Sequence, residues 1–320
     1  MLLTVATLER VDRRLRFGKP KKVVRLNQLQ PRPYHQPIRR LWPALLTFVG
    51  LVLLLLALGS AAFKLGLLGN PWSRFERDTL NPGFRSPATP GDLGVPFQHV
   101  TIANGLRRLD GFYVAAPSEC TKPVAVLIFH GRNETIADWA AAQKRFRDEC
   151  ISSLAFDYSG HGRSSGPGTI ANLNSDSIEA YAAFLKLTPH SRHCLLSHSM
   201  GGGPMLWVAG SVGVAVDCIV IASPFSSLRS MAERGGLPKL LGVLMPVAWD
   251  NLGRVQRIHA PLLWIHSRDD KTIPIAEGRA VFDAALSPKR ALILDGFDHN
   301  AIYKALPDRI WAALSAFVRG

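Results

Sequence analysis

The chain lacks the motifs that mark metal sites and nucleotide sites. Its 320 residues contain no H-E-x-x-H, no paired C-x-x-C and no carboxylate-rich calcium loop, and no G-x-G-x-x-G or P-loop follows an apolar run. Cysteine is scarce, with four residues, and neither a heptad nor a collagen repeat recurs. We therefore expect no metal and no cofactor. Because 47% of the residues are hydrophobic, a sizeable globular core is available.

Positive charge is concentrated at the N-terminus. Residues 1–40 contain eleven Lys and Arg against Glu9 and Asp12, so this arm carries +9 of the total formal charge of +14. The remainder of the chain is nearly balanced, which argues against a nucleic-acid-binding domain. A basic arm of this kind is attracted to anionic lipid headgroups.

An uncharged apolar run follows the basic arm. Residues 41–63 would form a helix about 34 Å long, enough to cross a hydrocarbon core of roughly 30 Å. Since the Lys and Arg excess precedes the run, we expect a single-pass protein of the inner (cytoplasmic) membrane with a cytoplasmic N-terminus. The later residues would then be periplasmic or otherwise extracytoplasmic. A cleaved signal peptide ending near Ser60-Ala61-Ala62, or a twin-arginine signal at Arg39-Arg40, is the alternative, and either leads to the same side of the membrane.

After the apolar run, a Pro- and Gly-containing stretch at residues 64–96 predicts a linker, and residues 97–320 predict an α/β domain. Short apolar runs alternate there with helical patterns, which indicates a mostly parallel sheet covered by helices on both faces. Functional residues in such a sheet lie beyond the carboxyl ends of the strands. The expected strands lie at 99–103, 111–117, 124–130, 152–158, 194–199, 218–223, 261–267 and 291–296.

The run CLLSHS is followed by a serine in a turn of small residues. Ser199 stands in Ser197-His198-Ser199-Met200-Gly201, a pattern typical of a sharp strand-to-helix turn that lifts a nucleophilic hydroxyl clear of the sheet. Ser197 replaces the more usual glycine. An ordinary Gly-rich turn is the alternative interpretation of this motif alone.

Two further strand ends supply partners for such a serine. Asp270 follows the run PLLWIHS, and His299 follows the last strand, so the chain order is Ser, Asp, His. Asp269 adjoins Asp270 and is the alternative acid, although the spacing to Ile273-Pro274 favours Asp270. His130, His161 and His198 also lie near strand ends, and we expect them to pack or hydrogen-bond locally.

Together these residues resemble the α/β-hydrolase superfamily over roughly residues 97–318. The resemblance also includes His130-Gly131-Arg132-Asn133 and the block from Asp157 to Ser164. The chain is most similar to small-cap, single-pass membrane-anchored serine hydrolases related to the yeast bud-emergence suppressor, which are similar to serine aminopeptidases and monoglyceride lipases.

The resemblance implies a catalytic role for each residue. Ser199 would attack an acyl carbonyl, His299 would act as general base, and Asp270 would hold the imidazole. The backbone N–H groups of Met200 and Arg132 would bind the oxyanion. The superfamily's strand order also implies Cys120–Cys150 and Cys194–Cys218 disulfides, with four buried thiols as the alternative.

A short insertion at about 224–256 predicts a small cap, and its apolar residues 237–249 would receive an acyl chain, touch the bilayer or simply cover the core. We expect a serine esterase acting on small-molecule or lipid-like acyl esters. A serine peptidase or amidase would use the same residues, and a catalytically silent binding module is the third alternative. The sequence indicates no oligomeric state.

Overall fold

The computed structural model describes residues 37–64, 71–83, 86–211, 214–242, 245 and 248–320. Its contacts divide the chain into two units, Met1–Leu67 and Leu68–Gly320, and each is described by itself. Of the expected basic arm, residues 1–40, only the last four positions lie within the described residues.

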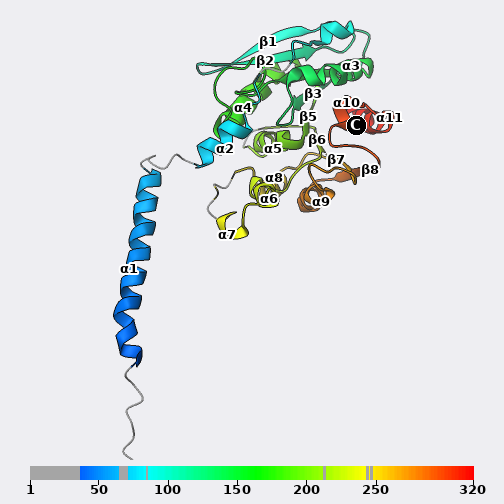
Figure 1. Cartoon of the computed structure of the whole chain (residues 1–320). Coiled ribbons are helices and arrows are strands. Elements are labelled where there is room, and N and C mark those ends of the chain that lie inside the picture. Colours follow the sequence, from blue (N-terminus) through cyan, green and yellow to red (C-terminus); the bar gives the residue numbers. More distant parts are fainter. Residues whose placement is uncertain (1–36, 65–70, 84–85, 212–213, 243–244, 246–247) are drawn as a thin grey trace, which may run out of the picture. The chain divides into compact units, whose positions relative to one another are not determined.

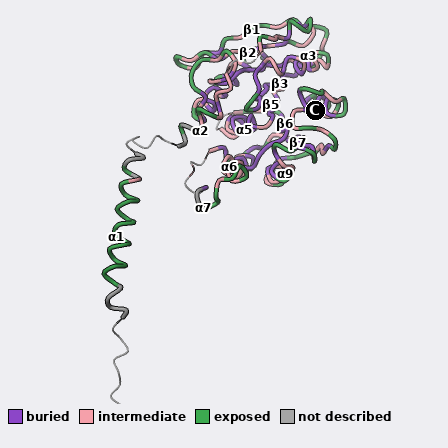
Figure 2. The backbone as a smooth tube through the Cα atoms, in the orientation of Figure 1, coloured by how far each residue is buried: buried purple, intermediate pink, exposed green. Residues whose placement is uncertain are grey.

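The first unit contains helix α1, Pro37–Lys64, drawn in blue in Figure 1. Its stretch Trp42–Gly59 is long and apolar enough to cross a membrane, judged by length and composition. The side chains along that stretch are not buried, as the green tube in Figure 2 shows. The helix contains the whole of the predicted span at 41–63.

The second unit is built on a mixed eight-stranded sheet with helices on both faces (Figure 1). The strand order is β1-β2-β4-β3-β5-β6-β7-β8; β2 is antiparallel to both of its neighbours, and the strands from β4 to β8 are parallel. The strands are β1 (Gln98–Asn104), β2 (Arg107–Val114), β3 (Val124–Phe129), β4 (Ser152–Phe156), β5 (Arg192–His198), β6 (Cys218–Ala222), β7 (Leu262–Ser267) and β8 (Lys289–Leu294).

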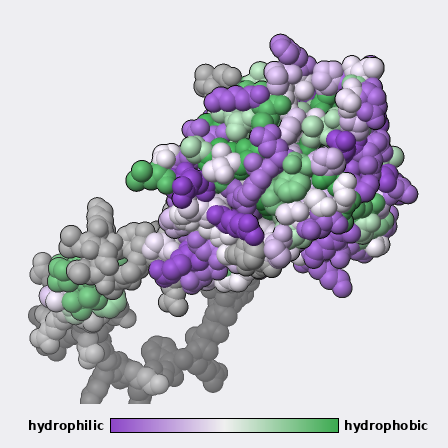
Figure 3. All heavy atoms as spheres, turned by 90° about the horizontal axis from the view of Figure 1, so that it is seen from above, coloured by the Kyte–Doolittle hydropathy of each residue, from purple (hydrophilic) through white to green (hydrophobic). Residues whose placement is uncertain are grey.

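The central strands are apolar on both faces because helices cover both. In β3, Ala125, Leu127 and Phe129 belong to one core cluster, whereas Val124, Val126 and Ile128 belong to the other. Figure 2 shows the buried strands between the two helical layers. On the face that Figure 3 shows, hydrophilic and hydrophobic side chains are interspersed.

The helices divide between the two core clusters. The first cluster includes residues of α4 (Ile170–Leu187), α5 (Gly202–Ala209), α8 (Asn251–Val255) and α9 (Ile275–Ala284). The second includes residues of η2 (Ile136–Trp139), α3 (Ala140–Asp148), α10 (Ala301–Lys304) and α11 (Asp308–Arg319). Between β6 and β7 lie α6 (Leu228–Arg234), α7 (Lys239–Gly242) and α8, within the region predicted as a small cap.

Regular structure occurs within the segment expected to be a linker. It contains α2 (Pro71–Thr79) and the single turn η1 (Pro90–Leu93), and Leu80 is buried in the first core cluster. Asn81 donates to the carbonyl of Gly168, and the backbone N–H of Ile170 donates to Glu76. The compact domain therefore begins earlier than residue 97, because contacts with the start of α4 fix a polar helix that has no strong pattern of its own.

Two disulfides join the four cysteines. Cys120 pairs with Cys150, and Cys194 pairs with Cys218. The second pair links facing positions of the neighbouring strands β5 and β6. The connectivity implied by the resemblance is therefore confirmed, and the alternative of four buried thiols is wrong.

Candidate active site

The strand order itself marks where a site should lie. Strand β4 lies beside β3 on one side, and the next strand in the chain, β5, lies beside β3 on the other side. In an open parallel sheet, such a reversal leaves a crevice beyond the carboxyl ends of the two central strands. The residues that follow β3 and β5 are Gly131-Arg132 and Ser199, both singled out by the sequence.

Ser199 occupies a strained turn between β5 and α5. Its φ is +53°, a region that residues with a side chain rarely adopt. The turn continues through η3 (Ser199–Gly201) into α5. A β-carbon at Gly201 would lie 2.1 Å from the carbonyl oxygen of Phe129, and one at Gly203 would lie 2.4 Å from Trp249. Small residues are therefore required, as the motif predicts.

His299 and Asp270 are joined directly. His299 Nδ1 lies 2.7 Å from Asp270 Oδ2, and Asp270 Oδ1 accepts hydrogen bonds from the backbone N–H groups of Thr272 and Ile273. Asp269, in contrast, is exposed and accepts from the N–H of Gly296. The structure thus places Asp270, and not Asp269, against the histidine.

The Asp270 carboxyl is held in its charged form. Burial by itself would raise its pKa, but the hydrogen bond and charge of His299, together with the N–H of Ile273, lower the pKa to about 2. A second buried imidazole, His266, lies 3.5 Å from Asp270 and contacts the carbonyl of Ile273 at 2.9 Å. Burial lowers the pKa of His266, which therefore supports Asp270 as a neutral ring.

Ser199 lines a cavity with a volume of about 750 Å³. Arg132 and Met200, the two residues expected to supply oxyanion donors, line the same cavity. The structure therefore brings Ser199, Met200 and Arg132 together. The other lining residues are mostly apolar: Thr79, Leu80, Phe225, Leu228, Met231, Ala232, Gly235, Gly236, Leu237, Pro238, Trp249, Thr272 and Ile273.

The backbone of His299 contacts the residue before Ser199, but no recorded hydrogen bond joins the two described side chains of Ser199 and His299. His299 follows β8, and its backbone carbonyl oxygen lies 2.8 Å from Nε2 of His198, the residue before Ser199. Among the recorded hydrogen bonds of these two described residues, none joins Ser199 to His299. Such bonds are often long in a protein without substrate and tighten when substrate binds.

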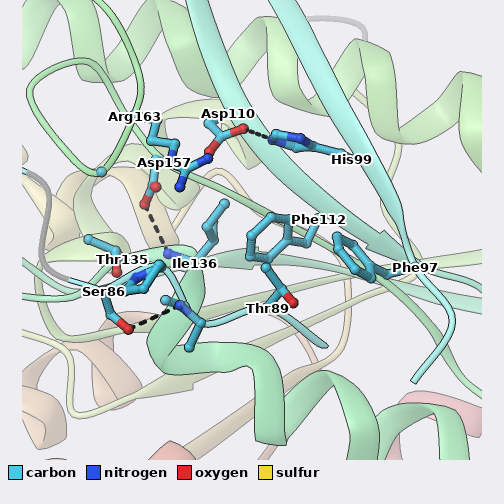
Figure 4. Close-up of a pocket in the computed structure, with 14 residues that line it drawn as sticks. Ser86, Thr89, Phe97, His99, Asp110, Phe112, Thr135, Ile136, Asp157 and Arg163 are labelled. Atoms are coloured by element: carbon cyan, nitrogen blue, oxygen red, sulfur yellow. Dashed lines mark hydrogen bonds and ion pairs between the residues drawn. The ribbon is translucent and has the colours of Figure 1, made fainter. Parts of the chain in front are cut away.

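Another cavity, of about 80 Å³, lies away from these residues. Figure 4 shows Asp157 and Arg163 lining it together with Phe97 and Phe112; Asp157 accepts from the backbone N–H of Ile136 at 2.9 Å. Ser199, Met200 and Arg132 do not line this cavity, whereas all three line the cavity of about 750 Å³, so we place the candidate site there. His299 lines a third cavity, of about 20 Å³.

Sequence reasoning missed a buried residue beneath the site. Glu134 was not singled out at all, and it contacts the N–H of Gly131 and the ring of His198. His161, expected to hydrogen-bond locally, contacts the carbonyl of Arg132 at 3.1 Å. A glutamate three residues after the glycine of His-Gly-x was the available signal. Among the described residues, no group of three His, Cys, Asp or Glu side chains could hold a metal ion.

A strained serine at the elbow after the central strand, with a histidine and an aspartate after later strands of the same mixed sheet, defines an α/β-hydrolase. The chain is a member of the α/β-hydrolase superfamily. Residues 122–252 match the family described as serine aminopeptidase, S33.

Individual relatives are distant. The chain is 27% identical over 175 residues to the human protein ABHD12B, covering 48% of each chain, and 29% identical over 202 residues to an uncharacterized protein of Mycobacterium tuberculosis, covering 60% of this chain and 68% of that one. The chain spans about half the length of the first curated relatives that it matches. The esterase Pf2001 of Pyrococcus furiosus superposes with a TM-score of 0.61 at 21% identity, covering 75% of this chain and 97% of that one.

Proposed function

We propose that the protein is a membrane-anchored serine esterase that cleaves carboxylic esters with an apolar acyl group. One observation carries this proposal: the strained Ser199 faces a cavity of about 750 Å³, while His299 is already paired with a charged Asp270. The fold alone would not specify a reaction, because the same fold supports many.

In the proposed reaction, Ser199 Oγ attacks the ester carbonyl and its proton passes to His299 Nε2. Asp270 accepts from Nδ1–H and stabilises the imidazolium that forms. The backbone N–H groups of Met200 and Arg132 donate to the oxyanion. The ester C–O bond then breaks, and the alcohol leaves with the proton from His299. Water, deprotonated by the same histidine, hydrolyses the acyl-enzyme and restores Ser199.

The lining of the cavity supports an acyl substrate. Phe225, Leu228, Met231, Trp249 and Ile273 present hydrocarbon or aromatic surface beside the nucleophile. Burying methylene groups on such a surface contributes about 0.8 kcal/mol each, so longer acyl chains should bind more tightly until the cavity is filled.

The anchor and its orientation belong to the same proposal. Residues 41–63 would span the membrane, with residues 1–40 in the cytoplasm and the hydrolase unit on the periplasmic or extracytoplasmic side. The two disulfides support this side, because disulfides persist in oxidising compartments.

A serine peptidase or amidase is the second candidate, and the match of residues 122–252 to the serine aminopeptidase family favours it. The residues named so far would serve either reaction, so only substrates separate the two.

The test is to treat the purified full-length protein with a fluorophosphonate and to map the modified residue by mass spectrometry. Turnover of p-nitrophenyl esters of increasing chain length is then compared with that of aminoacyl amides. We expect a label on Ser199 and ester turnover that rises with chain length. Labelling without ester turnover, together with amide cleavage, would favour the peptidase, and an unlabelled Ser199 would refute both.

A further inference from the structure

Beneath the proposed catalytic residues lies a buried acid–imidazole pair that the reaction does not use directly. Glu134 and His198 are 4% and 0% exposed. Glu134 Oε1 lies 2.6 Å from His198 Nδ1, although the two residues are 64 positions apart in the chain. Two ionisable side chains are seldom buried at such depth unless each satisfies the other.

The pair connects three separate parts of the site. Through Oε2, Glu134 accepts from the backbone N–H of Gly131 at 2.8 Å and so fixes the loop that carries Arg132. His198 immediately precedes Ser199. Its Nε2 lies 2.8 Å from the backbone carbonyl oxygen of His299. One chain of hydrogen bonds therefore runs from the oxyanion loop, past the nucleophile, to the catalytic histidine.

The partners of His198 determine where its protons lie. A carboxylate and a backbone carbonyl are both acceptors, so satisfying both contacts requires a proton on each ring nitrogen, which makes His198 an imidazolium. His161 shows the opposite case. Its two ring nitrogens also face acceptors, backbone carbonyls at 3.1 and 3.3 Å, but neither acceptor is a carboxylate that could offset the cost of burying a charge. Burial therefore lowers the pKa of His161 to about 3, and the neutral ring donates to only one of the two carbonyls.

We propose that Glu134 and the protonated His198 form a positioning pair, which holds the oxyanion loop and the backbone of His299 in register around Ser199. The inference rests on the proposed function for its kinetic consequence, whereas the protonation of His198 does not depend on that function. Neither residue lines the cavity, so the pair would act through the residues it holds.

The surroundings favour the charged state of the pair. Burial alone would lower the pKa of His198, but the charge of Glu134 and the hydrogen bond to it raise that pKa above its ordinary value. Burial alone would raise the pKa of Glu134, but His198 lowers it to about 2. The other ionisable groups that face or act on these two side chains are His130, Tyr158, His161, His266, Asp270, His299 and Tyr303.

The first test reads the protonation of His198 without any activity. Full-length protein with ¹⁵N-labelled histidine, in detergent micelles at pH 8, should show His198 as a doubly protonated imidazolium; the resonance is assigned with His198→Gln. In Glu134→Gln the amide can still accept from Gly131 and can donate to Nδ1, so His198 should become a neutral ring. A neutral His198 in the unsubstituted protein, or a charged one in Glu134→Gln, would overturn the ion pair.

The second test measures positioning. Glu134→Ala should lower kcat for a p-nitrophenyl ester by about 10- to 100-fold and change KM by less than about threefold, because misplaced reacting groups slow the chemical step more than binding. Glu134→Gln should lose less, since it keeps the hydrogen bonds. Gln143→Ala is the matched control: it removes a buried side chain that donates to the carbonyl of Phe112, away from the site, and should lower Tm without changing kcat.

The results separate this inference from the proposed function. If Glu134→Ala retains kcat within twofold, or if Gln143→Ala loses as much as Glu134→Ala, the pair has no positioning role. If Glu134→Ala fails to fold, Glu134→Gln and the spectrum of His198 still decide. If the unsubstituted protein shows no ester turnover although His198 is charged, the proposed function fails and the ion pair stands.

Discussion

Asp270 is buried and accepts hydrogen bonds from backbone N–H groups, and these two features distinguish it from the adjacent Asp269. Its neighbour Asp269 is exposed and bonded to the N–H of Gly296, whereas Asp270 accepts from two backbone N–H groups and from His299. A carboxylate in this setting fixes the tautomer of the histidine and stabilises its charged form. The chemical role therefore depends on position in the turn and not on residue type.

Asp270→Asn should lower kcat/KM for esters by about 10³- to 10⁴-fold, because the asparagine favours the wrong tautomer of His299 while the backbone stays in place. Asp269→Asn is the matched control and should stay within about threefold of the unsubstituted protein. Both are measured with a p-nitrophenyl ester. Equal losses in the two variants would mean that the assignment to Asp270 is wrong.

The low pKa of Asp270 predicts that the stability of the fold decreases at acidic pH. The folded pKa of Asp270 is about 2, below its ordinary value of 3.8, so its ionisation stabilises the fold fully above about pH 5 and less as the pH falls towards 2. The expected contribution is about 2 kcal/mol. Urea unfolding of the unsubstituted protein and of Asp270→Asn should therefore differ more at pH 6 than at pH 3. A difference that is the same at both pH values would contradict the low pKa.

The sequence predicts Ser199, Asp270 and His299 because each stands in a short local pattern at a strand end. It does not predict the contact between Glu134 and His198, since that contact joins residues 64 positions apart through the β3–β5 pairing. A local sequence pattern carries no information about a contact between residues so far apart in the chain. Buried polar contacts of this kind become visible only when the sheet is assembled.

At the scale of elements, the cavity is formed by segments from several separate regions of the chain. Thr79 ends α2 and Leu80 follows it, Met231 lies on α6, and Ile273 follows β7. The parallel strands could be predicted because buried strands form continuous apolar runs. Helix α2 could not, because its nine residues are largely polar and its place depends on contacts such as that of Glu76 with Ile170.

Met231→Trp should shorten the acyl chain that the enzyme accepts, because the larger side chain fills part of the cavity. We expect kcat/KM for a long-chain ester to fall by about tenfold or more, while that for an acetyl ester changes by less than about threefold. Arg229→Trp places the same side chain on the same helix at a position that does not line the cavity, and it should leave both values unchanged. If Met231→Trp showed the same dependence of kcat/KM on acyl chain length as the unsubstituted protein, the cavity would not be the acyl-binding site.

At the scale of the whole chain, the basic arm, the apolar helix and the disulfide-bonded unit are consistent with one orientation. Eleven Lys and Arg precede the span, and both disulfides follow it. Translocating the arm would oppose the charge bias that sets orientation in most single-span proteins. The hydrolase unit would then act outside the cytoplasm, beside the membrane to which the chain would be attached.

A reporter that is active only outside the cytoplasm should function when fused after Gly320, and a cytoplasmic reporter at the same position should be silent. Thiol counting on protein taken directly from its membrane should find the four cysteines oxidised, because both disulfides would form in that compartment. The reverse reporter pattern with four free thiols would invert the proposed topology.

The central claim is that Ser199 is the nucleophile, and the most direct measurement is the ester turnover of Ser199→Ala in folded full-length protein. Its fold is checked by comparing its Tm with that of the unsubstituted protein. We predict that kcat falls by about 10⁴- to 10⁶-fold, with the residual rate supplied by the oxyanion donors and substrate binding. Turnover within tenfold of the unsubstituted protein would contradict the account.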